Sequence, residues 1–92
     1  MSYRLEFGSA RVEKQYEKFP LSFPLEERQA IAQKIEGLQD NPRPHGCKKV
    51  KGNVYRLRFG DWRVVYRTYK KERIVAIAKI AKRRKGFYKE FE

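Results

Sequence analysis

The stretch NVYRLRFGDWRVVYRTY, residues 53–69, decides the fold. Two runs rich in β-branched and aromatic residues flank Gly60-Asp61, and glycine at the first loop position favours a two-residue type II′ turn. We therefore predict a β-hairpin whose register is fixed by this turn. One face of the hairpin then carries a double row of large side chains that we expect to line the core: Phe59 opposite Trp62, Leu57 opposite Val64 and Tyr55 opposite Tyr66.

The other face of the hairpin is cationic, because side chains alternate between the two faces of a strand. Its members are Arg56, Arg58, Arg63 and Arg67, with Arg58 directly opposite Arg63, and we call it the arginine face. Like charges placed opposite one another destabilise a sheet. An anionic partner compensates for that repulsion, and the guanidinium fork suits phosphate. We therefore favour a phosphate-binding face over a solvated face that merely tolerates its charge.

Length and charge point to one small domain that binds a polyanion. The chain has 92 residues, enough for a single domain (1–92) with a modest core. It carries 23 Lys and Arg against 11 Asp and Glu, and 16 of those 23 cations lie in residues 47–92. This asymmetry predicts nucleic acid as the partner, bound with an affinity that falls as salt rises. The same field would also steer an acidic protein.

Several other classes of function are disfavoured. The sequence has no apolar stretch of about 18 residues and no basic amphipathic helix, so we expect no membrane binding. The N-terminus lacks the apolar region of a secretory signal, so we expect a cytoplasmic protein. Cys47 is the single cysteine, which excludes an internal disulfide, and no second cysteine accompanies His45. We expect neither a metal nor a cofactor.

The N-terminal half has the pattern of a strand and two helices. Apolar residues alternate over 3–7, as in a strand with one buried face. Ser9 can cap a helix that ends at Pro20, and a second helix should run from about Pro24 to about Asp40. We expect these apolar stripes to face the core: Val12, Tyr16 and Phe19 in the first helix, and Leu25, Ala32, Ile35 and Leu38, with Ile31 at the margin, in the second.

Lysines open the basic half of the chain. Lys48, Lys49 and Lys51 are predicted to form a loop that leads into the hairpin. Placed beside the arginine face, they can hold an RNA backbone.

A third strand, Ile74 to about Ala81, follows the hairpin, and its register is ambiguous. In one register Val75 and Ile77 join the core while Ala76 and Ala78 form a floor of small side chains on the arginine face. The opposite register places Val75, Ile77 and Lys79 on that face. In either case we expect an α+β fold. The N-terminal strand and an antiparallel three-stranded meander form one sheet, and the two-helix hairpin between them covers one face of that sheet.

The C-terminal segment KRRKGFY, residues 82–88, leaves the strand end nearest the Gly60-Asp61 turn. This topology brings Arg83 and Tyr88 within reach of Arg58 and Arg63. We expect a short C-terminal helix or tail, anchored by Phe87 and Phe91.

This order of elements resembles the RelE/ParE toxin superfamily, and most of all its RelE branch, over nearly the whole chain. The specific part is YRLRFGDWRVVY, residues 55–66, followed by the basic Lys82-Arg83-Arg84 and a tyrosine at position 88. Members of the RelE branch are toxins of toxin-antitoxin pairs. They cut messenger RNA in the ribosomal A site and are silenced by an antitoxin that wraps around them. The resemblance therefore implies an endoribonuclease that inhibits translation.

The resemblance also implies roles for individual residues. Arg63 would stabilise the transition state and Arg83, or Arg84 in its place, would contact the scissile phosphate, while Tyr88 would orient the attacked nucleotide. Arg58 completes the catalytic set and occupies, with Arg56, positions where the best-known RelE enzyme has lysines. Arginine cannot act as a base, so Tyr88, Lys51 or Lys82 remains as a proton carrier. The substrate-binding residues would be Lys48, Lys49, Lys51, Arg56, Arg67, Lys82 and Arg84.

Three functions fit this sequence. We favour the ribosome-dependent endoribonuclease. A ParE-like inhibitor of DNA gyrase is the second, and the clustered arginines argue against it because such an inhibitor needs no phosphate cage. The third is a non-catalytic RNA-binding module or decayed toxin, since no histidine lies at the expected site. We also expect a cognate antitoxin, an acidic or amphipathic helix that covers the basic sheet face or displaces the C-terminal segment.

Overall fold

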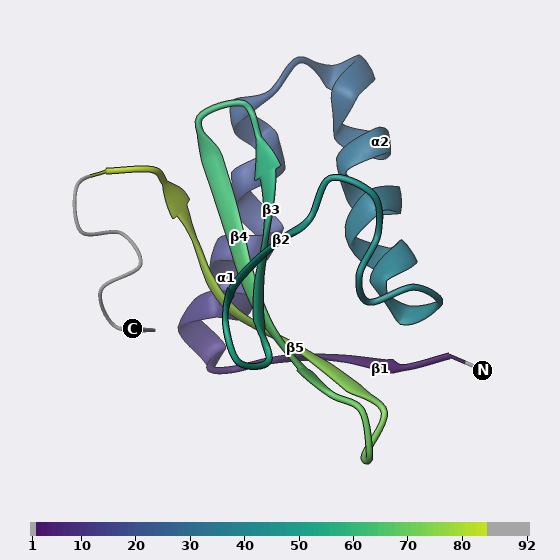
Figure 1. Cartoon of the computed structure of the whole chain (residues 1–92). Coiled ribbons are helices and arrows are strands. Elements are labelled where there is room, and N and C mark those ends of the chain that lie inside the picture. Colours follow the sequence, from purple (N-terminus) through teal and green to yellow (C-terminus); the bar gives the residue numbers. More distant parts are fainter. Residues whose placement is uncertain (1, 85–92) are drawn as a thin grey trace.

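The computed structural model describes residues 2–84, which form one five-stranded sheet with two α-helices on one of its faces (Figure 1). The strand order is β1-β5-β4-β3-β2; β1 runs parallel to β5 and every other pair is antiparallel. The predicted α+β class is confirmed, while the predicted C-terminal helix or tail lies outside the described residues. The elements are β1 (Arg4–Phe7), α1 (Ala10–Lys18), the 3-10 turn η1 (Phe19–Ser22), α2 (Leu25–Glu36), the 3-10 turn η2 (Gly37–Gln39), β2 (Lys48–Lys51), β3 (Val54–Phe59), β4 (Trp62–Tyr69) and β5 (Ile74–Lys82).

The β3–β4 hairpin has the register that its turn predicts. All three apolar pairs are confirmed, and Arg58 lies directly opposite Arg63. Gly60 adopts a φ of 58°, and among the non-glycine residues described only Arg73 has a positive φ, so Asp61 does not. A positive φ at the first loop position alone defines a type II′ turn, whose twist matches the flanking strands.

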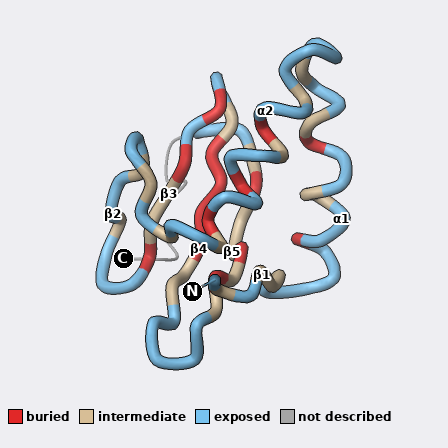
Figure 2. Tube along the Cα trace, turned by 90° about the vertical axis from the view of Figure 1, so that its right-hand side faces the viewer, coloured by how far each residue is buried: buried red, intermediate tan, exposed pale blue. Residues whose placement is uncertain are grey.

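The core lies between the helices and the sheet face that carries Leu57, Val64 and Tyr66, all without exposed surface (Figure 2). Ser9 caps α1 as predicted, because its Oγ accepts the Val12 N–H at 3.2 Å. Val12 and Phe19 are buried and Tyr16 packs beside them.

One predicted core residue of the second helix is wrong. Leu25 is 73% exposed, whereas Ile31, predicted at the margin, is buried with Ile35 and Leu38. Leu25 precedes Ile31 by six positions, and at 100° per residue this offset places Leu25 about 120° around the helix from Ile31. Leu25 is also the first residue of α2, so no preceding turn of helix covers it.

The predicted lysine loop is in fact an edge strand. Strand β2 pairs with β3, with Lys48 opposite Arg56, Lys49 opposite Tyr55 and Lys51 opposite Val54. A bulge between Lys49 and Lys51 breaks the alternation that marks a strand in sequence. Lysines on an edge strand discourage pairing with other chains. A lysine-rich composition is therefore suited to this edge position, although it does not predict a strand from sequence.

A bulge also resolves the ambiguous register of the third strand of the meander. Val75 and Ile77 lie in the core, as in the first of the two registers, and Ala78 packs on the opposite face. The register then shifts between Val65 and Tyr66 of β4, so that Lys79 comes opposite Val65. The arginine face therefore receives small side chains from the first part of β5 and one additional cation from the second.

Candidate functional site

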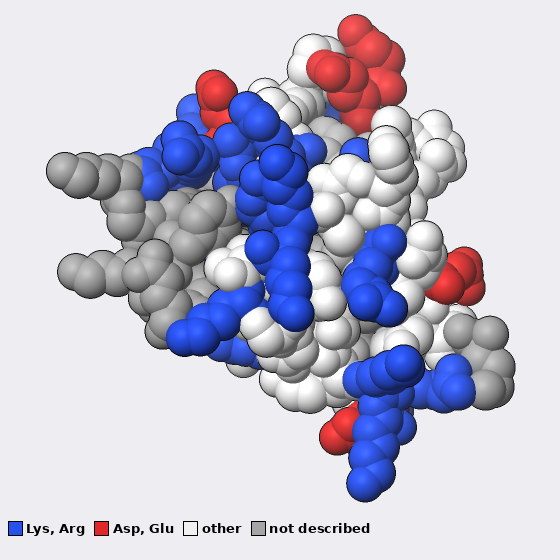
Figure 3. All heavy atoms as spheres, in the orientation of Figure 1, with Lys and Arg blue, Asp and Glu red and all other residues white. Residues whose placement is uncertain are grey.

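The arginine face is the sheet face that the helices leave open. Figure 3 shows this side of the molecule, with Lys and Arg gathered over the strands and Asp and Glu at the periphery. Alternation along the strands, together with the observed pairing, places seven cations on it from four adjacent strands: Lys48 and Lys51 of β2, Arg56 and Arg58 of β3, Arg63 and Arg67 of β4 and Lys79 of β5.

A small apolar floor supports these cations. Val54 and Val65 are buried on this face, and Val50, Ala78 and Ala81 pack against them. The floor holds the strands together without filling the space above the sheet, because alanine and valine side chains are short. Arg58 is exposed and Arg56 is half-buried. Guanidinium groups standing above a low apolar floor can approach an extended phosphate backbone.

Arg63 differs from the exposed, phosphate-facing arginine that the sequence predicts. Its relative exposure is 5%. The Nη1 atom donates to the carbonyl oxygen of Gly60 at 2.9 Å and to that of Trp62 at 3.0 Å. The side chain therefore folds back along its own strand to the hairpin turn. It belongs to the arginine face by its position in β4, but its guanidinium group is directed to the backbone.

The backbone of Arg83 is also hydrogen-bonded to the hairpin turn. Its backbone N–H donates to the carbonyl oxygen of Asp61 at 2.9 Å, directly after the end of β5. The predicted approach of the post-strand segment to the turn is confirmed for the backbone. Arg83 and Arg84 are both exposed. Tyr88, the other residue predicted from this segment, lies outside the described residues.

Two lysines predicted to bind substrate at this face are placed on the other side of the sheet. Lys49 is paired with Tyr55, whose ring packs against the core. Lys82 is paired with Trp62, and its ammonium group lies 6.0 Å from the centroid of the indole ring. The bulges in β2 and β5 shift the alternation on which a sequence-based placement depends, and a cation–π contact retains Lys82 on the Trp62 side.

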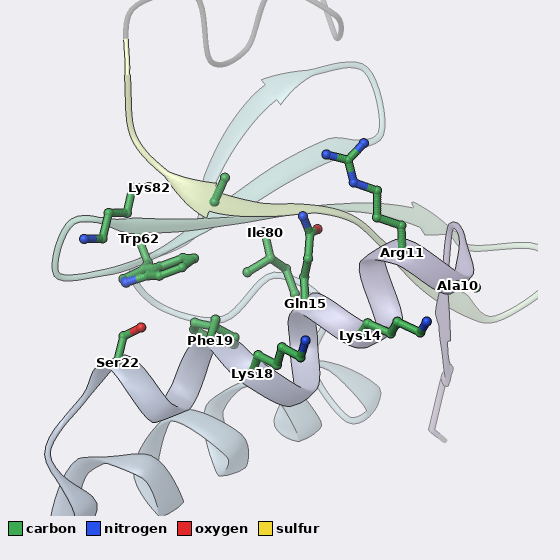
Figure 4. A pocket seen from close by; sticks show the side chains of 11 residues that line it. Ala10, Arg11, Lys14, Gln15, Lys18, Phe19, Ser22, Trp62, Ile80 and Lys82 are labelled. Atoms are coloured by element: carbon green, nitrogen blue, oxygen red, sulfur yellow. The ribbon is translucent and has the colours of Figure 1, made fainter.

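A groove that the sequence does not predict runs between α1 and the ends of β4 and β5 (Figure 4). It encloses about 700 Å³. Phe19, Trp62 and Ile80 form an apolar floor, and Arg11, Lys14, Lys18 and Lys82 stand around it. The helix cations look like an ordinary solvated surface in the sequence, so only the packing of α1 against β5 shows that they surround a groove.

The loop before β2 is tied to the centre of the sheet. The Tyr66 hydroxyl donates to the Pro42 carbonyl oxygen at 2.8 Å, and burial, followed by the neighbouring Cys47, raises the pKa of Tyr66. His45 is exposed in this loop. Within residues 2–84, no group of His, Cys, Asp and Glu is arranged to hold a metal ion, and none of the helices has the length and apolar composition of a transmembrane span.

The fold and the site define a class: a small α+β protein with two helices on one sheet face and cations on the other. Residues 9–87 match the family model described as the ParE toxin of type II toxin-antitoxin system, parDE. Because this match spans most of the chain, the protein belongs to the RelE/ParE toxin superfamily. No curated protein matches the sequence.

Several solved structures share the fold. The chain is 25% identical to the toxin of the archaeal RelE-RelB complex from Pyrococcus horikoshii OT3, with a TM-score of 0.67 over 92% of this chain and 99% of that one. It is 21% identical to the isolated E. coli RelE toxin, with a TM-score of 0.68 over 98% and 95% of the two chains. The toxin-antitoxin complex RelBE2 from Mycobacterium tuberculosis matches at 20% identity and a TM-score of 0.59, over 90% and 100%.

Proposed function

We propose that this toxin is a ribosome-dependent endoribonuclease that cleaves messenger RNA in the A site. One observation supports the proposal most strongly: Arg58 and the backbone of Arg83 lie at the same end of the sheet, beside the hairpin turn. Arg58 lies two residues before Gly60 on β3, and the Arg83 N–H is bonded to Asp61 in the adjoining turn. The exposed Arg58 and Lys48 and the half-buried Arg56 extend the cationic surface away from this point, as a track for the phosphate backbone would require.

In the proposed reaction, the ribose 2′-hydroxyl attacks the adjacent phosphate in line with the leaving 5′-oxygen. Negative charge accumulates on the non-bridging oxygens of the phosphorane, and Arg58 and Arg83 stabilise that charge by donating charge-assisted hydrogen bonds. The products are a 2′,3′-cyclic phosphate and a 5′-hydroxyl. Guanidinium groups stay protonated at neutral pH, so proton transfer falls to Tyr88 or Lys51, of which Lys51 lies on the arginine face.

Electrostatic stabilisation by arginines acts only on a correctly oriented phosphate. Orientation of the attacking and leaving groups can contribute several powers of ten to such a reaction. The arginine face spans four strands, and a hollow of about 370 Å³ reaches it only at the β5 edge, where Ala78, Lys79 and Ala81 lie beside α1. We therefore assign orientation of the message to the ribosome, and we expect free RNA to be bound but cleaved slowly.

Expression in bacteria tests this function. Wild-type protein should arrest growth and leave messenger fragments with new 5′ ends inside reading frames. Arg58→Ala and Arg83→Ala should fold normally and lose both effects, whereas Lys71→Ala removes a cation from the exposed β4–β5 turn and should keep both. Harmless wild-type expression with intact messages, combined with salt-sensitive RNA binding, would instead identify a non-catalytic RNA-binding module.

The match to the ParE toxin model favours a second candidate, an inhibitor of DNA gyrase on the same fold. Arginines gathered on the open sheet face are not needed for that activity. The two functions differ in what is broken. Gyrase-linked DNA breaks with intact messenger RNA after brief expression would support the inhibitor, and cleaved messages with intact DNA would support the nuclease.

An antitoxin partner is also proposed, because the similar solved structures include RelE toxins bound to RelB antitoxins. The groove beside α1 fits the chemistry of an acidic amphipathic helix. Its apolar floor can cover the apolar face of such a helix, and Lys14 and Lys18 of α1, with Lys82 of β5, can pair with its carboxylates (Figure 4). Binding here would place the partner next to Arg83, at the end of the arginine face.

A further inference from the structure

The hollow of about 370 Å³ between α1 and the second half of β5 gathers cations from three parts of the chain. Strand β1 pairs with β5 only along Ile74–Ile77, so within the described residues the remainder of β5 is an edge of the sheet, and α1 lies beside it. The cations are Arg11 of α1, Lys79 of β5 and Arg84, two residues past the end of β5. We call this site the β5 hollow.

The β5 hollow is positively charged and accessible. Arg11 and Arg84 are exposed and Lys79 is half-buried. No Asp or Glu is among the described residues that line the hollow, and in the same part of the chain neither arginine forms an ion pair. Glu13 lies two positions from Arg11, about 200° around α1, and so belongs to another face of the helix. An anion that enters the hollow therefore meets three cations and no competing carboxylate.

The β5 hollow is continuous with the arginine face. Ala78 and Ala81 line the hollow and also pack on the apolar floor of that face. Ala81 is paired with Arg63, which is paired with Arg58. Neighbouring strands lie about 4.8 Å apart, so the hollow begins about 10 Å from the backbone of Arg58. An extended RNA strand that crosses the arginine face therefore reaches the hollow within a few nucleotides.

We propose that the β5 hollow binds a second phosphate group of this RNA strand, beyond the one that is cleaved. Arg11, Lys79 and Arg84 donate charge-assisted hydrogen bonds to its non-bridging oxygens. The two consecutive arginines after β5 then act on different phosphates, Arg83 on the scissile one and Arg84 on the second. The proposal rests on the proposed nuclease function only for the identity of the RNA, which in that case is the message.

A phosphate suits this lining better than a nucleobase does. The described residues that line the hollow include no aromatic side chain on which a base would stack, whereas the groove beside α1 has Phe19 and Trp62. Arg11 borders both spaces, and Figure 4 shows its guanidinium group directed away from Lys14 and Lys18 of the groove. Contact through a phosphate alone is independent of the base sequence.

RNA binding by matched variants tests the site without cleavage. The probe is a single-stranded RNA with 2′-O-methyl groups throughout, titrated with salt. Arg11→Gln/Arg84→Gln should have a slope of log K against log salt less steep by about 0.7, the value for one phosphate. Arg11→Lys/Arg84→Lys retains both charges and should keep the wild-type slope. Lys70→Gln/Lys71→Gln removes two cations from the exposed β4–β5 turn and should also keep it. An unchanged slope in the first variant, or an equal loss in the first and third, would overturn the proposal.

A second experiment identifies the strand that supplies the phosphate. Messages that carry one neutral methylphosphonate linkage, moved in turn along the A-site region, are cleaved on programmed ribosomes. One linkage other than the scissile one should slow the wild type about tenfold, and Arg11→Gln/Arg84→Gln should be insensitive to that same linkage. Effects of linkage and variant that multiply at every position would overturn the assignment of this phosphate to the message. A wild type that cleaves no message, together with the expected loss of salt slope, would overturn the nuclease function and leave the phosphate site standing.

Discussion

Replacement of Arg58 by glutamine should lower the salt dependence of RNA binding by one phosphate contact. The arginine face and the adjoining strand end carry eight exposed or half-buried cations: Lys48, Lys51, Arg56, Arg58, Arg67, Lys79, Arg83 and Arg84. If each contacts one phosphate of single-stranded RNA, the slope of log K against log salt is about −6, or about −0.7 for each contact. The Arg58→Gln variant should therefore have a slope less steep by about 0.7 and bind about fourfold more weakly at 0.15 M salt.

The assay is a salt titration with an RNA that carries 2′-O-methyl groups throughout, so that binding is measured without cleavage. Lys71→Gln controls for the loss of one positive charge at a distant turn. Equal losses of slope for both variants would mean that net charge, and not the arginine face, determines binding, and would refute this reasoning.

Three further outcomes follow from the structure. Gly60→Ala should lower the free energy of unfolding by about 1–2 kcal/mol, because alanine is strained at the positive φ of this position. A clash is not the cause, since the nearest side-chain atom would lie 3.7 Å from the new methyl group. Calorimetry that showed no fall in Tm would contradict this prediction. Burial raises the pKa of Tyr66, so above pH 10 the unfolded chain loses this proton before the folded protein does, and stability falls with rising pH. Tyr66→Phe should make that decline shallower in denaturant titrations between pH 9 and 11, and parallel curves would refute the assignment. Replacing both Lys14 and Lys18 with glutamate should slow association with the antitoxin several-fold at low salt, as measured by binding kinetics. Lys71→Glu is the control. If the double variant and the control associated at the same rate, the α1 groove would be excluded as the antitoxin-binding site.

The hairpin could be predicted from sequence because its determinants are local. A glycine at the first position of a two-residue loop fixes the turn, the turn fixes the register, and alternation then assigns Arg58 and Arg63 to one face. The cap at Ser9 is equally local. Features of this kind depend on residues within a few positions of one another.

Bulges account for most of what the sequence did not predict in the sheet. A single extra residue in β2 interrupts the alternation by which this lysine-rich strand could be recognised in the sequence. A second extra residue, in β5, places Lys79 on the arginine face and Lys82 beside Trp62. A bulge depends on how two strands twist against each other, so an alternation pattern within one strand cannot locate it.

The candidate site also required tertiary information. Position in β4 places Arg63 on the arginine face, but only its side-chain conformation shows that the guanidinium group turns back to Gly60 and Trp62. The groove beside α1 joins Lys14 to Lys82, which are far apart in the chain. The sequence shows that α1 and the end of β5 both carry cations, but only the fold shows that the two elements line one groove.

The decisive measurement of the proposed nuclease activity is cleavage by purified protein on ribosomes programmed with a defined message. We expect the message to be cut in the A-site codon and the upstream fragment to end in a 2′,3′-cyclic phosphate. Arg83→Ala should abolish the product, whereas Lys71→Ala should not. An intact message, or fragments that end in a 3′-hydroxyl, would contradict the proposed activity.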